Sequence, residues 1–476
     1  MTPRNTSNFS ALAVVALLVF LYWPEQGLEP KNVRQSLPNA ELTRIAMTMQ
    51  AKPLTHGDTQ ELISFGSKLF FDQSLSLNGK VSCATCHNPE LSFTDQKTLA
   101  VGLSPTGRNT PTLINVGEMH WFFWDGRSDS LVTQALGPIS AQEEHGINRG
   151  RLAQLIYKHH KSEYENNFGA FPKELSELLK SDDIFNCEPV PTHSPLPLSI
   201  ASYGLATLGS SSLQKDIIHE AAKKDTPPNR LFSRKFASMK RASTLVSQAC
   251  DKLSKDGKQQ LKDVAINFGR ALEAFQKTIQ AKQSPFDKFL IELSAGKSLE
   301  QSFSKDFGAE EWLGFKTFVE SSCSDCHLGS NFTDQQFHNI GLPFSPLMDL
   351  GRAKGILQLV ASDIKCRELA PQERESCKEM DYLDINSIET LAAFKTPSLR
   401  NLEDTKPYMH DGRFPDLDTV LDHYENSDLE PGMGHRSESI PNLEWTAEER
   451  NALKAFLKAL NSEVTFYREP GILGKK

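Results

Sequence analysis

Two short runs with the pattern Cys-x-x-Cys-His, at residues 83–87 and 323–327, constrain this chain more than any other feature. The pattern is typical of covalent c-type haem attachment, because two thiols three residues apart can each bond to one vinyl group of the same porphyrin. The following histidine then lies beneath the iron as its proximal ligand. We therefore expect two covalently bound c-type haems. The expected attachment residues are Cys83, Cys86, His87, Cys323, Cys326 and His327.

A single run of this kind could also bind zinc or act as a redox-active cysteine pair. A structural zinc ion needs four protein ligands, so each run would require further partners. No second C-x-x-C pair and no H-x3-H pair lies near either run in the sequence. Two complete copies behind an export-like N-terminus favour haem over both alternatives.

The composition is that of a globular body of ordinary polarity. The chain has 476 residues, of which 38% are hydrophobic and 24% charged, and this length suits two or three domains with sizeable cores. The formal net charge of −8 argues against nucleic acid as a partner. The same charge is compatible with docking a basic electron-transfer protein.

The only long apolar run spans residues 9–23 and follows Arg4, so we expect residues 1–30 to be a signal peptide or an N-terminal membrane anchor. The run is shorter than the roughly 20 residues that cross a bilayer comfortably. No small-x-small cleavage site is obvious after it, so anchoring to the inner membrane stays open. In either case the protein is exported, and we expect it in the periplasm.

Four cysteines remain outside the two runs. They are Cys187, Cys250, Cys366 and Cys377. An even number permits disulfides in an oxidising compartment. We expect Cys187 to pair with Cys250 and Cys366 with Cys377, because each pair closes a local loop; four free buried thiols are the alternative.

Apolar residues recur at helical spacing in both halves, whereas strand-type alternation is scarce. We expect helices over residues 59–70, 131–136 (ending near Gly137 and Pro138), 152–168, 264–279 and 310–319, one from Pro285 after an N-cap at Ser284, and one after a capping box at Thr446 and Glu449. Each half thus has the order helix, C-x-x-C-H, loop-rich wrap, helix. This order predicts a mainly α fold with two cytochrome c-like haem domains packed together.

The expected domains follow from this order. An N-terminal haem domain spans residues 40–168, a loop-rich insertion with many prolines and serines spans residues 169–260, and a C-terminal haem domain spans residues 261–465.

Several further motifs resemble those of the bacterial di-haem cytochrome c peroxidase and MauG family. They lie at residues 108–113, 124–127, 134–139, 337–341, 349–352, 394–401 and 407–412. The resemblance covers roughly residues 58–165 and 262–462 and leaves the insertion outside. It implies that peroxide reacts at the N-terminal haem and that the C-terminal haem receives electrons and passes them on.

The resemblance also implies what surrounds the first haem. Many family members carry a loop histidine that must leave before peroxide binds, and Leu103 stands at that place here. We therefore expect the first iron to be five-coordinate without prior reductive activation, with His145 as the alternative ligand. Glu144 matches the catalytic glutamate, which would transfer the proton during O–O cleavage. Gln134 and Pro138 would line the same pocket, and Trp124 would lie between the haems. The alternative for Glu144 is a solvated acid beside Glu143.

At the second haem, Tyr424 stands where many members have a methionine ligand, as in MauG proteins. A phenolate oxygen favours ferric iron more than a thioether does, so it should lower the reduction potential. The alternative is that Met409 or Met433 binds the iron.

The resemblance implies two more ligand sets. Asn109, Thr405 and Pro407 match the calcium site of the family, where oxygen atoms would hold one hard cation. Arg127, Arg352 and Arg400 could pair with haem propionates or form ordinary ion pairs.

We therefore expect a di-haem peroxidase that reduces hydrogen peroxide to water with electrons from a small donor protein, such as a cytochrome c or a cupredoxin. One alternative is a MauG-like oxidase that acts on a protein side chain, although Ser321 and Ser322 leave no Trp or Tyr just before the second run. The other is a non-enzymatic di-haem electron carrier. A homodimer stays open.

Overall fold

The computed structural model describes residues 36–51, 57–180, 185, 187, 250–251, 253–343, 349–369, 377, 383, 387–426 and 431–471. The expected signal peptide or anchor and most of the expected insertion lie outside these ranges. Within them, no helix is long and apolar enough to cross a membrane.

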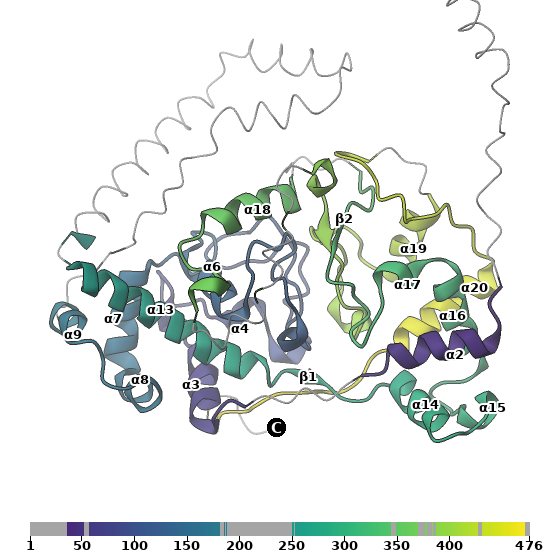
Figure 1. Cartoon of the computed structure of the whole chain (residues 1–476), viewed down its shortest axis with the longest axis horizontal. Helices are drawn as coiled ribbons and strands as arrows, with labels where there is room; N and C mark the ends of the chain where they lie inside the picture. The colour runs from purple at the N-terminus through teal and green to yellow at the C-terminus, as the bar shows by residue number, and fades with distance from the viewer. Residues whose placement is uncertain are drawn as a thin grey trace, which may run out of the picture. The chain divides into compact units, whose positions relative to one another are not determined.

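The described chain is mainly helical, as predicted (Figure 1). The helices of the first half are α2 (Asn39–Thr48), α3 (Gln60–Phe71), α4 (Cys83–Cys86), α5 (Leu131–Gln134), α6 (Leu136–Ser140), α7 (Arg149–His159), α8 (Lys161–Phe168), α9 (Lys173–Leu179) and α13 (Lys255–Gln276). Those of the second half are α14 (Pro285–Ser294), α15 (Leu299–Ser302), α16 (Ala309–Glu320), α17 (Cys323–Cys326), α18 (Arg352–Ala361), α19 (Leu417–Glu425) and α20 (Ala447–Lys458).

The described strands have two residues each. Strand β1 (Gln280–Ala281) pairs antiparallel with β4 (Val464–Thr465), and β2 (Phe337–His338) pairs antiparallel with β3 (Phe394–Lys395). The side chains of Ser284 and Thr446 accept hydrogen bonds from the backbone N–H groups three residues later, which confirms both predicted caps.

Three predicted helices have wrong boundaries. The helix expected over 264–279 begins earlier, at Lys255, and ends at Gln276 as α13. The segment expected as one helix over 152–168 divides at His160, which leaves the helical conformation and whose ring Nε2 lies 2.7 Å from Asp72 Oδ2. The helix expected over 131–136 ends at Gln134 as α5, and a second helix, α6, begins at Leu136 and runs through Pro138. A proline is tolerated there because the first backbone N–H groups of a helix have no partner within it.

The described residues form two main hydrophobic cores, and the same type of helix–helix packing occurs in both. In the first core α13 packs on α3, and in the second α20 packs on α16. A Cβ added at Gly66 of α3 would lie 1.8 Å from the carbonyl oxygen of Ala271, and one added at Gly314 of α16 would lie 1.9 Å from that of Ala452. In each half, the helix that precedes the Cys-x-x-Cys-His run therefore crosses a later helix at a glycine.

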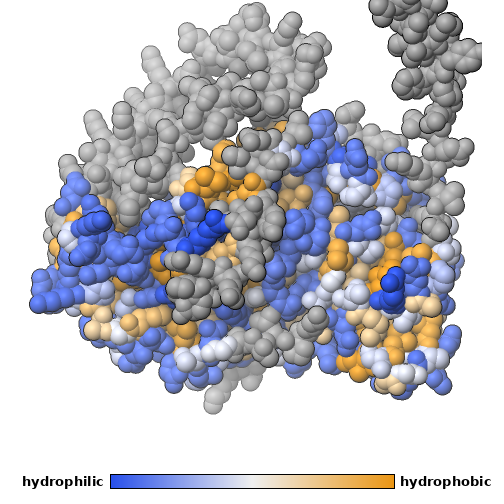
Figure 2. Space-filling model, viewed as in Figure 1, coloured by the Kyte–Doolittle hydropathy of each residue, from blue (hydrophilic) through white to orange (hydrophobic). Residues whose placement is uncertain are grey.

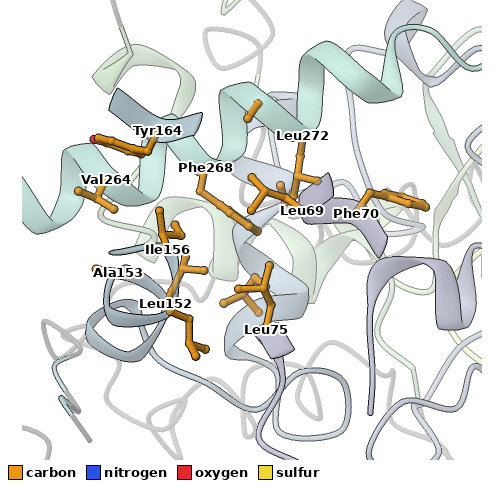
Figure 3. Packing of buried hydrophobic residues seen from close by; sticks show 14 of the residues in the cluster. Leu69, Phe70, Leu75, Leu152, Ala153, Ile156, Tyr164, Val264, Phe268 and Leu272 are labelled. Carbon is orange, nitrogen blue, oxygen red and sulfur yellow. The ribbon is translucent and has the colours of Figure 1, made fainter. Parts of the chain in front are cut away.

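Figure 3 shows the first core, with Phe268 and Leu272 of α13 beside Leu69 of α3 and near Ile156 of α7. The expected C-terminal domain began at residue 261, yet Leu261 to Ile279 pack in this first core. We propose a domain boundary after Ile279 for this reason.

The ends of the described chain cross between the cores. Helix α2 packs in the second core through Leu42 and Ala46, close to α16 and α20 (Figure 1). Near the other end, Phe466 packs on Phe93 of the first core with 5.1 Å between ring centroids. Figure 2 shows a mosaic of hydrophilic and hydrophobic residues over the visible face.

Both predicted disulfides are present, so the alternative of four free thiols is wrong. Cys187 is bonded to Cys250, and Cys366 to Cys377. The first bond joins two residues of the expected insertion that lie 63 positions apart in the sequence. The described start of that segment is helical: α9 packs Leu175 and Leu179 into the first core.

Candidate active site

One cavity of about 1090 Å³ is lined by residues of both Cys-x-x-Cys-His runs. Among its lining residues are Cys86 and His87 of the first run and Cys323, Cys326 and His327 of the second. The four cysteines of the runs form no disulfide. Because thioether bonds to haem need free thiols, this is the state that attachment requires.

Each run forms a one-turn helix whose histidine is oriented by the same backbone contact. The Nδ1 atom of His87 lies 3.0 Å from the carbonyl oxygen of Phe93, and that of His327 lies 2.9 Å from the carbonyl oxygen of Phe332. A carbonyl oxygen only accepts, so Nδ1 carries the proton and Nε2 is free to bind a metal. Burial also lowers the pKa of both histidines, which favours the neutral form. The donor set of each run therefore fits a c-type haem.

The expected distal residues of the first site line the same cavity. These are Gln134 at the end of α5, Pro138 in α6 and Glu144 in the loop that follows α6. The backbone oxygen of Glu144 accepts a hydrogen bond of 3.3 Å from the N–H of Leu103, which fixes the loop. Burial raises the pKa of the Glu144 carboxyl, whereas the nearby charge of Arg127 lowers it. The partly buried carboxyl is therefore able to hold or release a proton nearer neutral pH than an ordinary glutamate.

His145 has a different environment from Glu144. Its side chain is buried, with 3% of the residue exposed, and its Nδ1 atom lies 2.7 Å from the carbonyl oxygen of Leu75. It is not among the residues that line the cavity. The structure thus gives no support to His145 as the alternative iron ligand.

Trp124 lines the cavity and connects the two halves of the chain. Its Nε1–H donates a hydrogen bond of 3.0 Å to the carbonyl oxygen of Asn109, and its own carbonyl oxygen accepts one of 2.8 Å from the N–H of Lys395 in β3. Beside it, Arg108 forms ion pairs with Asp125 at 2.7 Å and Asp349 at 2.6 Å. These contacts hold the Trp124 loop against the second half.

Of the three arginines expected at the propionates, only Arg127 lines the cavity. Arg352 donates to the carbonyl oxygens of Asp125 and Gly126. Arg400 forms a bidentate ion pair with Asp287, in which both side chains are 1% exposed. For Arg352 and Arg400 the expectation of propionate pairing is not supported, because buried protein groups occupy their N–H donors.

Sequence reasoning missed other cationic residues of the cavity wall. They are Arg108, Arg149, Lys354 and Lys395. Burial lowers the pKa of Lys395 to about 8. Arg108 and Lys395 lie within family motifs quoted above, so the sequence held a signal for both.

At the second run, Tyr424 of α19 lines the cavity. Burial raises the pKa of its phenol, and the neighbouring Cys323 and Cys326 raise it further, which reflects how near Tyr424 lies to the second attachment site. Met409 also lines the cavity. Met433 does not, and its backbone oxygen accepts a hydrogen bond from Asn339. The structure thus brings Tyr424 and Met409 to the cavity and leaves Met433 outside.

Two more features of the second site escaped the sequence analysis. Trp445 lines the cavity, and its Nε1–H donates a hydrogen bond of 2.9 Å to Ser321 Oγ, two residues before the run. Cys326, Asp334 and His338 also have ligand atoms within 4.8 Å of one another. Haem attachment would consume the thiol of Cys326, so this cluster needs no separate metal.

The three expected calcium residues, Asn109, Thr405 and Pro407, line the cavity as well. The side-chain amide of Asn109 donates 2.8 Å to the carbonyl oxygen of Lys97, and Thr405 Oγ1 donates 3.1 Å to that of Leu402. A calcium site formed by these residues is a proposal that rests on the family resemblance.

Three comparisons relate this chain to known proteins. The family model described as di-haem cytochrome c peroxidase matches residues 60–194. The methylamine utilization protein MauG of Methylorubrum extorquens is 30% identical over 418 residues, which cover 87% of this chain and 81% of that protein. The cytochrome-c peroxidase IdrP2 of Denitromonas iodatirespirans is 25% identical over 469 residues, covering 97% and 94%.

A solved structure supports the fold. The diheme peroxidase BthA from Burkholderia thailandensis aligns with a TM-score of 0.51 at 16% identity, covering 86% of this chain and 87% of that one.

Proposed function

Because this chain belongs to the di-haem cytochrome c peroxidase and MauG family, we propose that it is a periplasmic peroxidase that reduces hydrogen peroxide to water. Two electrons and two protons convert one peroxide molecule to two water molecules. A small donor protein, such as a cytochrome c or a cupredoxin, supplies the electrons through the second haem. Cys83, Cys86 and His87 hold the first haem, and Cys323, Cys326, His327 and Tyr424 hold the second.

The observation that carries this proposal is the position of Glu144, a partly buried carboxyl on the wall of the cavity that contains both attachment sites. The bound haem supplies the redox-active iron at which the O–O bond is cleaved. Glu144 takes a proton from one peroxide oxygen and returns it to the other, which is general acid–base catalysis. Gln134 borders the same pocket and orients the peroxide. Leu103 stands where many family members have a loop histidine, so that histidine does not block the iron here.

The test is the variant Glu144→Gln in the holoenzyme. We expect kcat/KM for hydrogen peroxide to fall by roughly 10²–10⁴-fold, because a general acid–base group contributes about that factor. The absorbance spectrum and the haem content should stay unchanged. Glu143→Gln is the matched control, because Glu143 also lines the cavity but is exposed. An equal loss in both variants would contradict the assignment.

A MauG-like oxidase is the second candidate, and two observations favour it. Relatives of this chain are named methylamine utilization protein MauG. The sequence has no Trp or Tyr directly before the second run, but Trp445 reaches Ser321 from a distant part of the chain and could carry an oxidising equivalent outward. Turnover of peroxide with a reduced small cytochrome separates the two candidates, because a protein oxidase would consume that donor slowly.

The electron carrier is the least supported alternative. A carrier would need no acid–base group in the pocket, and Glu144 provides one.

A further inference from the structure

A segment from the second half of the chain lines the cavity and packs against the first haem domain. This cap segment, residues 352–369, consists of α18 and the turns that follow it. Its residues Lys354, Gln358 and Asp363 are exposed and also line the cavity, so they mark the rim of its opening. α6 and the loop after it contribute two more exposed residues to the lining of the same cavity, Ser140 and Glu143.

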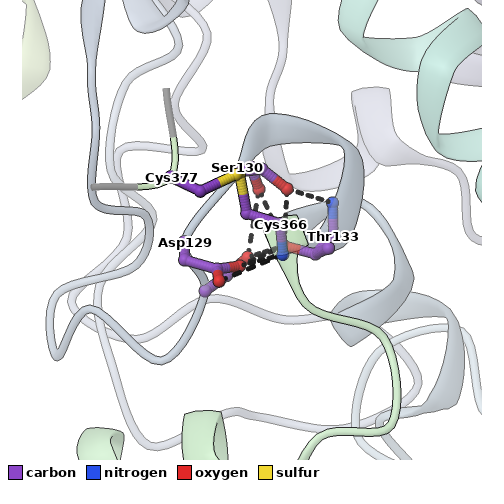
Figure 4. The surroundings of a disulfide bond; sticks show 6 residues. Asp129, Ser130, Thr133, Cys366 and Cys377 are labelled. Carbon is purple, nitrogen blue, oxygen red and sulfur yellow. Dashed lines mark hydrogen bonds between the residues drawn. A yellow bond between two sulfur atoms is a disulfide. The ribbon is translucent and has the colours of Figure 1, made fainter. Parts of the chain in front are cut away.

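The far end of the cap segment is tied to the first haem domain by buried contacts. The backbone N–H of Cys366 lies 3.1 Å from both carboxylate oxygens of Asp129, just before α5 (Figure 4). Ile364 and Leu369 pack with Val132 and Ile266 in a small core of their own. The disulfide from Cys366 to Cys377 adds a covalent constraint.

Charged contacts fix the part of the segment that borders the opening. Arg149, the first residue of α7, forms a bidentate ion pair with Asp363 whose N–O distances are 2.7 and 2.5 Å. Both residues line the cavity. The Asp363 side chain is 40% exposed and that of Arg149 14%, so the pair lies where the cavity meets solvent. Lys262 of α13 adds a hydrogen bond of 2.6 Å to the carbonyl oxygen of Asp363.

We propose that the Arg149–Asp363 ion pair holds the cap segment closed over the first haem pocket, so that the protein selects small peroxides over bulky organic hydroperoxides. The segment packs against Val132 of α5, the helix that ends at Gln134, and the pair lines the same cavity as Gln134 and Glu144. Larger molecules enter only when the segment opens locally. This inference rests on the proposed function, because it assumes that ligands bind at the first haem.

The experiment is equilibrium binding of two ligands to the ferric holoenzyme, followed by absorbance. Cyanide is small enough to pass the closed segment, whereas 4-phenylimidazole is not. In Asp363→Asn the affinity for 4-phenylimidazole relative to cyanide should rise about fivefold, because losing an exposed ion pair raises the population of the open segment by about that factor. Arg149→Gln removes the other partner of the ion pair and should raise the same affinity ratio. Thermal unfolding verifies that each variant is folded.

Glu368→Gln is the matched control. Glu368 lies in the same segment and pairs with Lys262 at 3.3 Å, but it does not line the cavity. The affinity ratio should therefore stay at the wild-type value in this variant. An unchanged ratio in both pair variants, or an equal rise in the control, would overturn the inference and leave the proposed function intact. Failure of cyanide to bind the wild-type protein would overturn both.

Discussion

Gly66 of α3 lies so close to Ala271 of α13 that a Cβ at residue 66 would stand 1.8 Å from the Ala271 carbonyl oxygen. Gly314 and Ala452 repeat this relationship between α16 and α20 with a distance of 1.9 Å. The two halves therefore share one helix crossing, and in each half the glycine-bearing helix precedes the Cys-x-x-Cys-His run. The duplication is visible in the packing and in the motifs alike.

Gly66→Ala should destabilise the first haem domain. The added methyl group meets backbone, which cannot rotate away, so the helices must separate, at a cost of about 1–3 kcal/mol for overpacking. Chemical denaturation of the holoprotein measures the change. Gly57→Ala is the control, because nothing lies within 4 Å of a Cβ there and its φ is not positive. Equal stabilities of the two variants would show that the close crossing is absent in solution.

The pH dependence of peroxide reduction should reflect Glu144. Burial raises the pKa of this carboxyl above its ordinary value, so the carboxylate that accepts a proton is present only above that raised pKa. The rate kcat/KM should fall as the pH decreases through it. Arg127 lowers the pKa of Glu144, so Arg127→Gln should move this acidic limb to higher pH. A pH–rate profile of both proteins measures the shift; an unmoved limb would assign it to another group.

Replacing Tyr424 by Met should raise the reduction potential of the second haem, because a thioether stabilises ferric iron less than a phenolate does. Spectroelectrochemical titration measures the potential. Met409 also lines the cavity, so Met409→Leu serves as the matched variant, and we expect it to leave the potential close to that of the wild type. If the Met409 variant alone changes the potential, Met409 is the ligand and the assignment of Tyr424 is wrong.

Local patterns in the sequence were sufficient to predict many elements of this fold. The caps at Ser284 and Thr446 and both disulfide pairs were predicted correctly, because each depends on residues close in sequence or on a small set of available partners. Helical periodicity also identified α3 and α16. It shows that a helix has a buried face, but not which core receives that face. The sequence analysis therefore placed α13 in the C-terminal domain, whereas the side chains of α13 pack in the first core.

Apart from Arg108 and Lys395, which lie within family motifs, the features of the site that the sequence analysis missed depend on contacts between distant residues. Asp363 reaches Arg149 and Trp445 reaches Ser321, with no motif that links either pair. His145 follows Glu144 directly, yet it packs under the loop against Leu75. Arg400 forms a buried ion pair with Asp287 and does not line the cavity. Family motifs identify which residues belong to the site region, whereas packing decides which side chains face the cavity.

The central proposal is that the two irons would differ: His87 would hold one iron with a position left for peroxide beside Glu144, and His327 and Tyr424 would together hold the other. Electron paramagnetic resonance of the ferric holoprotein as isolated tests this most directly. The account predicts one high-spin signal and one low-spin signal of equal intensity. Two low-spin signals would contradict it, because peroxide would then have no iron to bind.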